Sequence, residues 1–339
     1  MALTLMKSLD QEKETLSRPA LEGKKLLERI LIQDNRFGAK STLTFGQPES
    51  CKTAATCSFC EYYMRHYPSS YLFWRSALNA PIQIFKLPKW HLFIENDSGV
   101  HFFNRETGED ITKELIRKKK LTVFTTFNDL YKKAKPGVCN GVFFKDLHFK
   151  GIKNDEGTLQ WFRFIRDTLH SLSWTYVFLD EYQEMVKAGN GELMWYEIDK
   201  HSNDISSARK SNTGIHANAH QTSELDWRVI PGFMILLQMY GSQVIRKSIV
   251  TKQALSSLKK PDERYGAESW ICEGSHFGRI CFKKVYALPD GMSIEARIIS
   301  KDEHTKVCHL CHHVFIYKRT DQLFCSRACQ AKEARNRKK

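Results

Sequence analysis

Residues 41–74, STLTFGQPESCKTAATCSFCEYYMRHYPSSYLFW, decide which fold the rest of the chain is expected to have. The first six residues predict a short strand that ends in a glycine. Residues 53–66 predict a helix, because small and soft side chains recur there at three- and four-residue steps. The run YPSSYLFW then predicts a second strand. Strands and helices alternate in this way along most of the chain, which favours an α/β sheet with helices on both faces.

The polar loop at residues 46–53 has the pattern of a phosphate-binding loop. Such a loop needs a glycine at the end of a strand, backbone N–H groups at the start of a helix, and a lysine and a hydroxyl. Gly46 closes the predicted strand, and Lys52 and Thr53 open the predicted helix. Cys51 stands where the pattern has its second glycine, and this replacement costs on the order of 1 kcal/mol. Taken alone, the loop can also be a polar turn that matches the pattern by chance.

A second stretch, TYVFLDEYQEM, supplies adjacent carboxylates at the end of a predicted strand. Four apolar residues, Tyr176 to Leu179, are typical of a parallel strand buried on both faces. Asp180 and Glu181 follow at once. An acid in this place can hold Mg²⁺, and a glutamate beside it can activate water for hydrolysis. The alternative is a strand that runs into a solvated acidic turn.

A third stretch, HANAHQTSELDWR, places Gln221 at the end of a further short strand. A polar residue there can sense the γ-phosphate and position water. Arg209, in the preceding helix, is a candidate arginine finger that reaches the nucleotide of a neighbouring subunit, and Arg228 is the rival candidate. For each arginine, an ordinary surface charge is the alternative.

Together the three stretches resemble the additional-strand, catalytic-glutamate P-loop NTPases. Within these, the chain looks most like the FtsK–HerA DNA-pumping motors and their relatives in viruses and mobile elements, which include packaging ATPases and the zonula-occludens-toxin-like ATPases of filamentous phage. The resemblance covers about residues 40–240. It implies a mainly parallel, RecA-like sheet, ATP and Mg²⁺ as ligands, DNA as a partner, and a ring, commonly a hexamer, because the arginine finger acts in trans. Cys51 and residues 75–156 depart from the family pattern.

The resemblance also implies roles for individual residues. It implies that Lys52 and Thr53 contact phosphate and Mg²⁺, that Asp180 contacts Mg²⁺, that Glu181 is the base and that Gln221 is the sensor. The nucleotide-binding set is then Gly46, Ser50, Cys51, Lys52, Thr53 and Asp180, and the catalytic set is Glu181, Gln221 and Arg209.

Composition narrows the classes of partner. The 339 residues carry a formal net charge of +14, which favours a polyanion, nucleic acid before membrane. A soluble basic surface without a specific partner is the alternative. No apolar run is long enough to span a bilayer, and the N-terminus lacks the apolar stretch of a secretory signal. We therefore expect no membrane insertion and a cytoplasmic location, in a host cell if the protein is viral.

The C-terminus predicts a zinc module. Two short-spaced cysteine pairs match the tetrahedral coordination of Zn²⁺ by four thiolates: Cys308 and Cys311, then Cys325 and Cys329. Three nearby histidines are alternative ligands: His309, His312 and His313. The chain ends in ARNRKK, which can neutralise phosphates without reading bases. The alternative is a zinc knob that only stabilises the end of the chain or binds protein.

These features divide the chain into three parts. Residues 1–38 are a polar, helix-prone start that is expected to be flexible or peripheral. Residues 39–300 form the P-loop domain, and residues 301–339 form the zinc module.

Cys57 and Cys60 form a further C-x-x-C pair, which is expected to pack in the core beneath the loop. The favoured function is an ATP-driven motor on DNA. The alternatives are a nucleotide-dependent DNA-binding regulator that is not a motor, and a zinc protein that binds no nucleotide.

Overall fold

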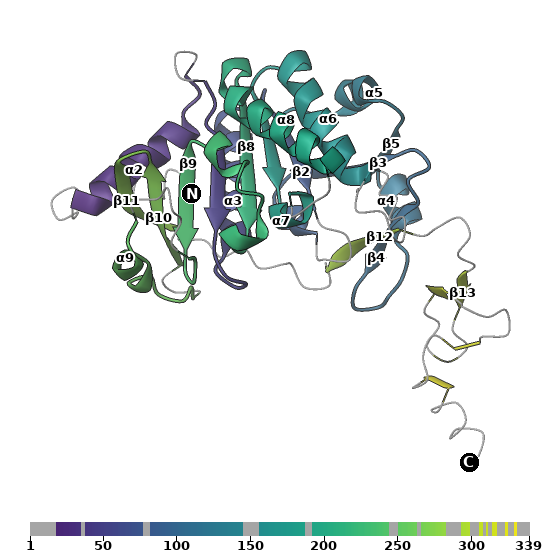
Figure 1. Ribbon diagram of the computed structural model, residues 1–339. Helices are drawn as coiled ribbons and strands as arrows, with labels where there is room; N and C mark the ends of the chain where they lie inside the picture. The colour runs from purple at the N-terminus through teal and green to yellow at the C-terminus, as the bar shows by residue number, and fades with distance from the viewer. Residues whose placement is uncertain are drawn as a thin grey trace.

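The computed structural model describes most of the chain up to residue 298 and short pieces beyond it (Figure 1). The described residues are 18–34, 38–76, 82–144, 156–186, 192–243, 250–262, 266–282, 293–298, 305–307, 310, 314–316, 323–324 and 329–330.

Ten strands of the described chain form one sheet. They are β1 (Thr42–Phe45), β2 (Tyr71–Arg75), β3 (Trp90–Glu95), β5 (Leu121–Phe124), β6 (Cys139–Phe143), β7 (Thr175–Leu179), β8 (Thr213–Ala219), β9 (Ile235–Met239), β10 (Ala267–Glu273) and β11 (His276–Phe282). Their order is β11-β10-β9-β1-β8-β7-β2-β6-β3-β5. All neighbours from β9 to β5 pair in parallel, and only β10 pairs antiparallel, with β9 and with β11. The mainly parallel α/β sheet expected from the sequence is therefore confirmed.

Helices cover both faces of this sheet. They are α2 (Arg18–Leu31), α3 (Lys52–His66), α4 (Thr112–Arg117), α5 (Phe127–Lys133), α6 (Glu156–Ser171), α7 (Tyr182–Met185), α8 (Glu192–Ala208) and α9 (Lys252–Ser256), with short 3₁₀ turns η1 (Gln83–Lys86), η2 (Arg209–Ser211), η3 (Thr222–Glu224) and η4 (Ile230–Gly232). Side chains alternate along β7, so Tyr176 and Phe178 join the apolar core that contains α3, while Val177 and Leu179 join the core that contains α6 and α8. The two cores explain why residues 176–179 are apolar on both faces.

Strand β8 lies between β1 and β7. Thr44 of β1 pairs with Asn218 of β8, and Ala217 of β8 pairs with Leu179 of β7. Because the three strands are parallel, their carboxyl ends lie side by side at one edge of the sheet. The loop after β1 and the two acids after β7 are thereby brought to the same edge, although more than a hundred residues separate them.

Residues 75–156, which depart from the family pattern, widen the sheet. They add β6, β3 and β5 beside β2. The apolar stretch QIFK, whose composition also suits a strand, forms η1 (residues 83–86) instead. Ile84 and Phe85 are buried in the core that contains α3, so this stretch covers the sheet and does not join it. A separate antiparallel pair, β4 (Val100–Asn104) with β12 (Ile294–Ile298), lies outside the main sheet.

The N-terminal segment contributes to the core. Helix α2 packs on β10 and β11, and Leu26, Leu27 and Ile30 are buried. A Cβ at Gly23 would lie 2.3 Å from the backbone oxygen of Arg279, so only glycine permits this close approach. Residues 18–31 are therefore part of the sheet's apolar core, and the expectation of a flexible or peripheral start does not hold for them.

The C-terminal region is described only in part. A short antiparallel pair, β13 (Thr305–Val307) with β14 (Val314–Ile316), flanks the first cysteine pair in sequence. Three of the four expected zinc ligands, Cys308, Cys311 and Cys325, lie outside the described residues, so the zinc site stays a prediction. Within the described part of the chain, no group of three or more His, Cys, Asp or Glu side chains is arranged to hold a metal ion. Nor does that part contain a helix whose length and apolar character would let it cross a membrane.

Candidate functional site

The loop between β1 and α3 closes tightly around Gly46. A Cβ on Gly46 would lie 2.3 Å from the Ser50 Oγ and 3.1 Å from the Met239 Cβ, so no larger residue fits. Ser50 is fully buried, and its hydroxyl has no hydrogen-bond partner among the described residues. The glycine is thus required by packing at the point where the chain leaves β1.

Cys51 adopts the backbone conformation that the missing glycine would adopt. Its φ of 64° and ψ of 28° lie in the left-handed region. Cys51 is also the N-cap of α3, and its side chain accepts no capping hydrogen bond. The first amides of a helix have no intrahelical partners, so the uncapped start of α3 leaves N–H groups available to an anion. The cysteine therefore preserves the shape of the loop at the cost of backbone strain.

Lys52 spans the mouth of the loop. Its ammonium donates to the backbone oxygens of Gly46 at 2.8 Å and of Gln47 at 3.0 Å, and it lies 3.0 Å from Nδ1 of His220. Burial lowers the pKa of Lys52, and the charges of Glu181 and Asp180 oppose this shift. These contacts place a buried cation against the backbone carbonyls of the loop.

Asp180 lies directly across from the start of α3. The Thr53 hydroxyl donates to its Oδ1 at 3.4 Å, and the Asn218 amide donates to the same oxygen at 3.2 Å. Arg75 donates to the backbone oxygen of Asp180 at 2.9 Å. Burial, followed by the neighbouring charge of Glu181, raises the pKa of Asp180. A buried carboxylate of this kind is favourable only when a cation shares its site.

Glu181 is connected to Lys52 through His220. The Nε2 of His220 lies 2.8 Å from the Glu181 carboxylate, and Gln183 donates to the same oxygen. Because the Lys52 ammonium can only donate, Nδ1 of His220 accepts and Nε2 carries the proton that goes to Glu181. Glu181 itself has a left-handed backbone, with φ of 49°, which turns its side chain back toward β8.

Side chains on one face of β8, and the residue just after it, contact α3. His216 contacts Tyr63 and Asn218 contacts Thr56, and His220, which follows the strand, contacts Lys52. The printed distances are 3.3 Å, 2.7 Å and 3.0 Å. Sequence reasoning missed Asn218 and His220, and it also missed Arg75. The period-two alternation in HANAH is the signal that could have identified the first two.

The remaining candidates contact other residues. Gln221 follows His220 and is partly buried, and its side-chain oxygen accepts from Ser223 at 3.4 Å and Gln243 at 3.5 Å. Arg209 is exposed in η2, which precedes β8, so it lies at the opposite edge of the sheet from the loop. Arg228 pairs with Asp226 and stacks on the Trp195 ring. The structure thus brings together Lys52, Thr53, Asp180 and Glu181, and it joins neither arginine to them.

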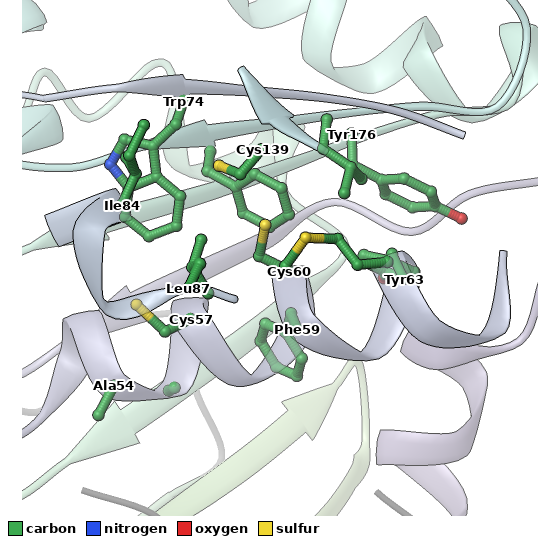
Figure 2. Close-up of a cluster of buried hydrophobic side chains, with 14 of the residues drawn as sticks. Ala54, Cys57, Phe59, Cys60, Tyr63, Trp74, Ile84, Leu87, Cys139 and Tyr176 are labelled. Carbon is green, nitrogen blue, oxygen red and sulfur yellow. The ribbon is translucent and has the colours of Figure 1, made fainter. Parts of the chain in front are cut away.

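Helix α3 anchors the loop to the sheet (Figure 2). Cys57 and Cys60 are fully buried, as expected for core packing, and Cys60 points toward Cys139 of β6. Burial raises the pKa of both thiols. Tyr63 stacks on Tyr176 of β7 with ring centroids 3.6 Å apart. The helix that starts at Lys52 is therefore packed against β7, the strand that Asp180 follows.

The donor set fits a hard divalent cation. Thr53 and Asp180 offer a hydroxyl and a carboxylate oxygen within 3.4 Å of each other. Mg²⁺ takes oxygen ligands and is bound by one or two carboxylates together with the phosphates of a nucleotide. The buried negative charge on Asp180 gives the cation an electrostatic reason to bind here.

No protein-family model and no curated protein sequence matches the chain. Among solved structures, the chain is similar to B204, the DNA-packaging ATPase from Sulfolobus turreted icosahedral virus, with 13% identity, a TM-score of 0.43, and coverage of 71% of this chain and 96% of that chain. It is similar to the N-terminal domain of zonular occludens toxin from Neisseria meningitidis, with 12% identity, a TM-score of 0.31, and coverage of 78% and 94%. It is also similar to a DnaB-like replicative helicase, with 12% identity, a TM-score of 0.38, and coverage of 83% and 66%. We infer the function from the side chains of the site and not from these similarities.

Proposed function

We propose that the chain is a P-loop ATPase that acts as a motor on DNA. One observation carries the proposal: a buried lysine at the start of a helix, Lys52, is joined through His220 to the second of two consecutive acids, and the adjacent Thr53 donates to the first. Anion-binding amides, a cation and a hydroxyl on one side, with two carboxylates on the other, are the parts that phosphoryl transfer to water requires.

The residues divide the work by their positions. When ATP binds, the Lys52 ammonium moves away from the carbonyls of Gly46 and Gln47 and contacts the β- and γ-phosphates. The negative charge of the phosphates offsets the cost of burying the ammonium. Thr53 and Asp180 would hold Mg²⁺, which would supply positive charge to stabilise the phosphates during hydrolysis. Glu181 takes the proton of the attacking water, and His220 orients the Glu181 carboxylate through the Nε2–H hydrogen bond.

The position of β8 between β1 and β7 supports the assignment to a division of the P-loop NTPases. In the additional-strand, catalytic-glutamate division that the motifs resemble, β8 corresponds to the additional strand and Glu181 to the catalytic glutamate. Within that division, we assign the chain to DNA motors of viruses or mobile elements that work as rings, with Arg209 or Arg228 reaching a neighbouring subunit. The formal charge of +14 supports a nucleic-acid partner. The zinc module at Cys308, Cys311, Cys325 and Cys329 is part of this proposal and would add a basic tail that holds DNA.

The test is ATP hydrolysis by Lys52→Ala with and without DNA. We expect kcat/KM to fall by a factor of about 100 to 1,000, because the variant loses a charged donor that acts on the transferring phosphate. Lys40→Ala is the matched control, since Lys40 is also buried but pairs with Glu273 and not with the residues around Lys52. Undiminished turnover in folded Lys52→Ala would refute the proposal. Nucleotide binding by the wild type without DNA-stimulated turnover would indicate a regulator instead of a motor.

A further inference from the structure

The strands that widen the sheet collect lysines from distant parts of the sequence. Strands β6, β3 and β5 are neighbours and parallel, so their amino ends lie at one edge. The residues that lead into these strands include five lysines, which we call the basic edge: Lys89, Lys118, Lys119, Lys120 and Lys135. Because the carboxyl ends hold the ATP site, the basic edge lies on the opposite side of the sheet from it.

Backbone hydrogen bonds hold the basic edge in place. The Cys139 amide donates to the Lys89 oxygen at 3.1 Å, and the Leu92 amide donates to the Lys120 oxygen at 2.8 Å. Lys135 is fixed from the side by Asn140, which donates to its backbone oxygen at 3.1 Å. Neighbouring strands lie about 4.8 Å apart. The lysines are therefore presented close together on a rigid frame.

The positive charge of the basic edge is largely uncompensated. Lys89, Lys119 and Lys135 are exposed, and none of them forms an ion pair with an acid of the described chain. Lys120 lies over the Trp90 ring, 4.6 Å from its centroid, and Lys118 pairs with Glu114. The charges act on His91 at the start of β3: burial first, then Lys135 and Lys120, lower its pKa to about 4.

We propose that the basic edge binds the phosphate backbone of DNA. Lysines on a fixed frame act as point charges for phosphates and read no bases, which suits a surface that must accept any sequence. The proposal deepens the DNA-directed function proposed above, because it names the surface that holds the DNA.

A connection to the ATP site runs through α3. The helix starts at the phosphate loop and ends at His66, and the turn after it reaches the approach to β6. There the Gly137 amide donates to the Ser70 oxygen at 2.9 Å, and a Cβ on Gly137 would lie 2.6 Å from the Pro68 oxygen. The helix therefore begins at the loop that contains Lys52, and the turn that follows the helix contacts the segment next to Lys135.

The experiment measures how DNA affinity depends on salt. The test variant carries Lys89→Gln, Lys119→Gln and Lys135→Gln, and the control variant removes three exposed lysines from the far end of the sheet, by Lys25→Gln, Lys252→Gln and Lys259→Gln. The full-length proteins are titrated onto a fluorescent duplex of about 30 base pairs between about 50 and 200 mM NaCl. Each lost phosphate contact lowers the magnitude of the negative slope of log K against log salt by about 0.9, so we expect this magnitude to fall by about 2.7 for the test variant and by less than about 1 for the control.

Equal slopes for the two variants, or an unchanged slope in the test variant, would overturn the proposal. So would a loss of binding to anionic phospholipid vesicles with DNA binding intact, because the edge would then be a membrane surface. ATP hydrolysis without DNA is measured on the same samples and should be unchanged in the test variant, whereas its stimulation by DNA should be lost. If the wild type hydrolyses no ATP but the salt slopes of the test and control variants still differ as expected, the proposed ATPase activity is refuted and the proposed DNA-binding role of the basic edge is supported.

Discussion

Replacing Asp180 by asparagine should make the nucleotide-free protein more stable and the enzyme inactive. The Asp180 side chain is only 7% exposed, and burial and the charge of Glu181 both raise its pKa. Asparagine has the same shape, and its oxygen can still accept from Thr53 and Asn218. The substitution therefore removes a desolvated charge and keeps the packing.

The size of the effect follows from this balance. Relieving an unfavourable group at a functional site typically adds about 0.5–2 kcal/mol to the free energy of unfolding. For a chain of this size, each kcal/mol raises Tm by about 2 °C. Hydrolysis should fall at least about 100-fold, because the carboxylate that draws Mg²⁺ to the phosphates is lost.

Thermal unfolding with and without Mg-ATP, together with steady-state hydrolysis, measures both effects on one sample. Wild-type Tm should rise with Mg-ATP and the Asp180→Asn Tm should rise less, since at a given concentration a ligand that binds more weakly stabilises the folded protein less. Asp204→Asn is the control. Burial also raises the pKa of Asp204, but this carboxylate pairs with Arg166 at 3.0 Å and not with the residues around Asp180. That variant should lose stability and keep its activity. A lower Tm for nucleotide-free Asp180→Asn, or retained hydrolysis, would refute the reasoning.

Two further predictions concern the loop and the core beneath it. Cys51→Val should lose about 1–2 kcal/mol more stability than Cys51→Ala and bind ATP more weakly, because a β-branched side chain fits a φ of 64° poorly. Urea unfolding and ATP titration of the two variants test this prediction. Equal stability and equal ATP affinity would contradict it. Burial lowers the pKa of His216 from 6.5 to about 3, so between these pH values the unfolded chain binds a proton that the folded chain does not. As the pH falls through this range, the free energy of unfolding should decrease by up to about 1.4 kcal/mol per pH unit. His216→Gln should make the free energy of unfolding less dependent on pH between 7 and 5, and an unchanged dependence would show that His216 does not titrate in this way.

Local patterns were sufficient for the elements of the site. Residues 42–45 alternate threonine with apolar side chains before a glycine, and residues 175–179 are a mainly apolar run before two acids; both patterns are typical of buried parallel strands. The same patterns did not identify η1, because Ile84 and Phe85 are as apolar as strand residues and only their packing over α3 distinguishes them. They also directed attention to Gln221 when the side chain that contacts Lys52 belongs to His220, one position earlier and on the other phase of the strand.

The sequence by itself determined the glycine-lysine loop after the first strand, the acidic pair and the parallel α/β class, because each depends on residues that are close together along the chain. The tertiary structure alone decided that β8 separates β1 from β7, that His220 joins Lys52 to Glu181, and that lysines more than forty residues apart share one edge. The order of strands in a sheet is set by which faces can be buried together, and this depends on the packing of the whole chain.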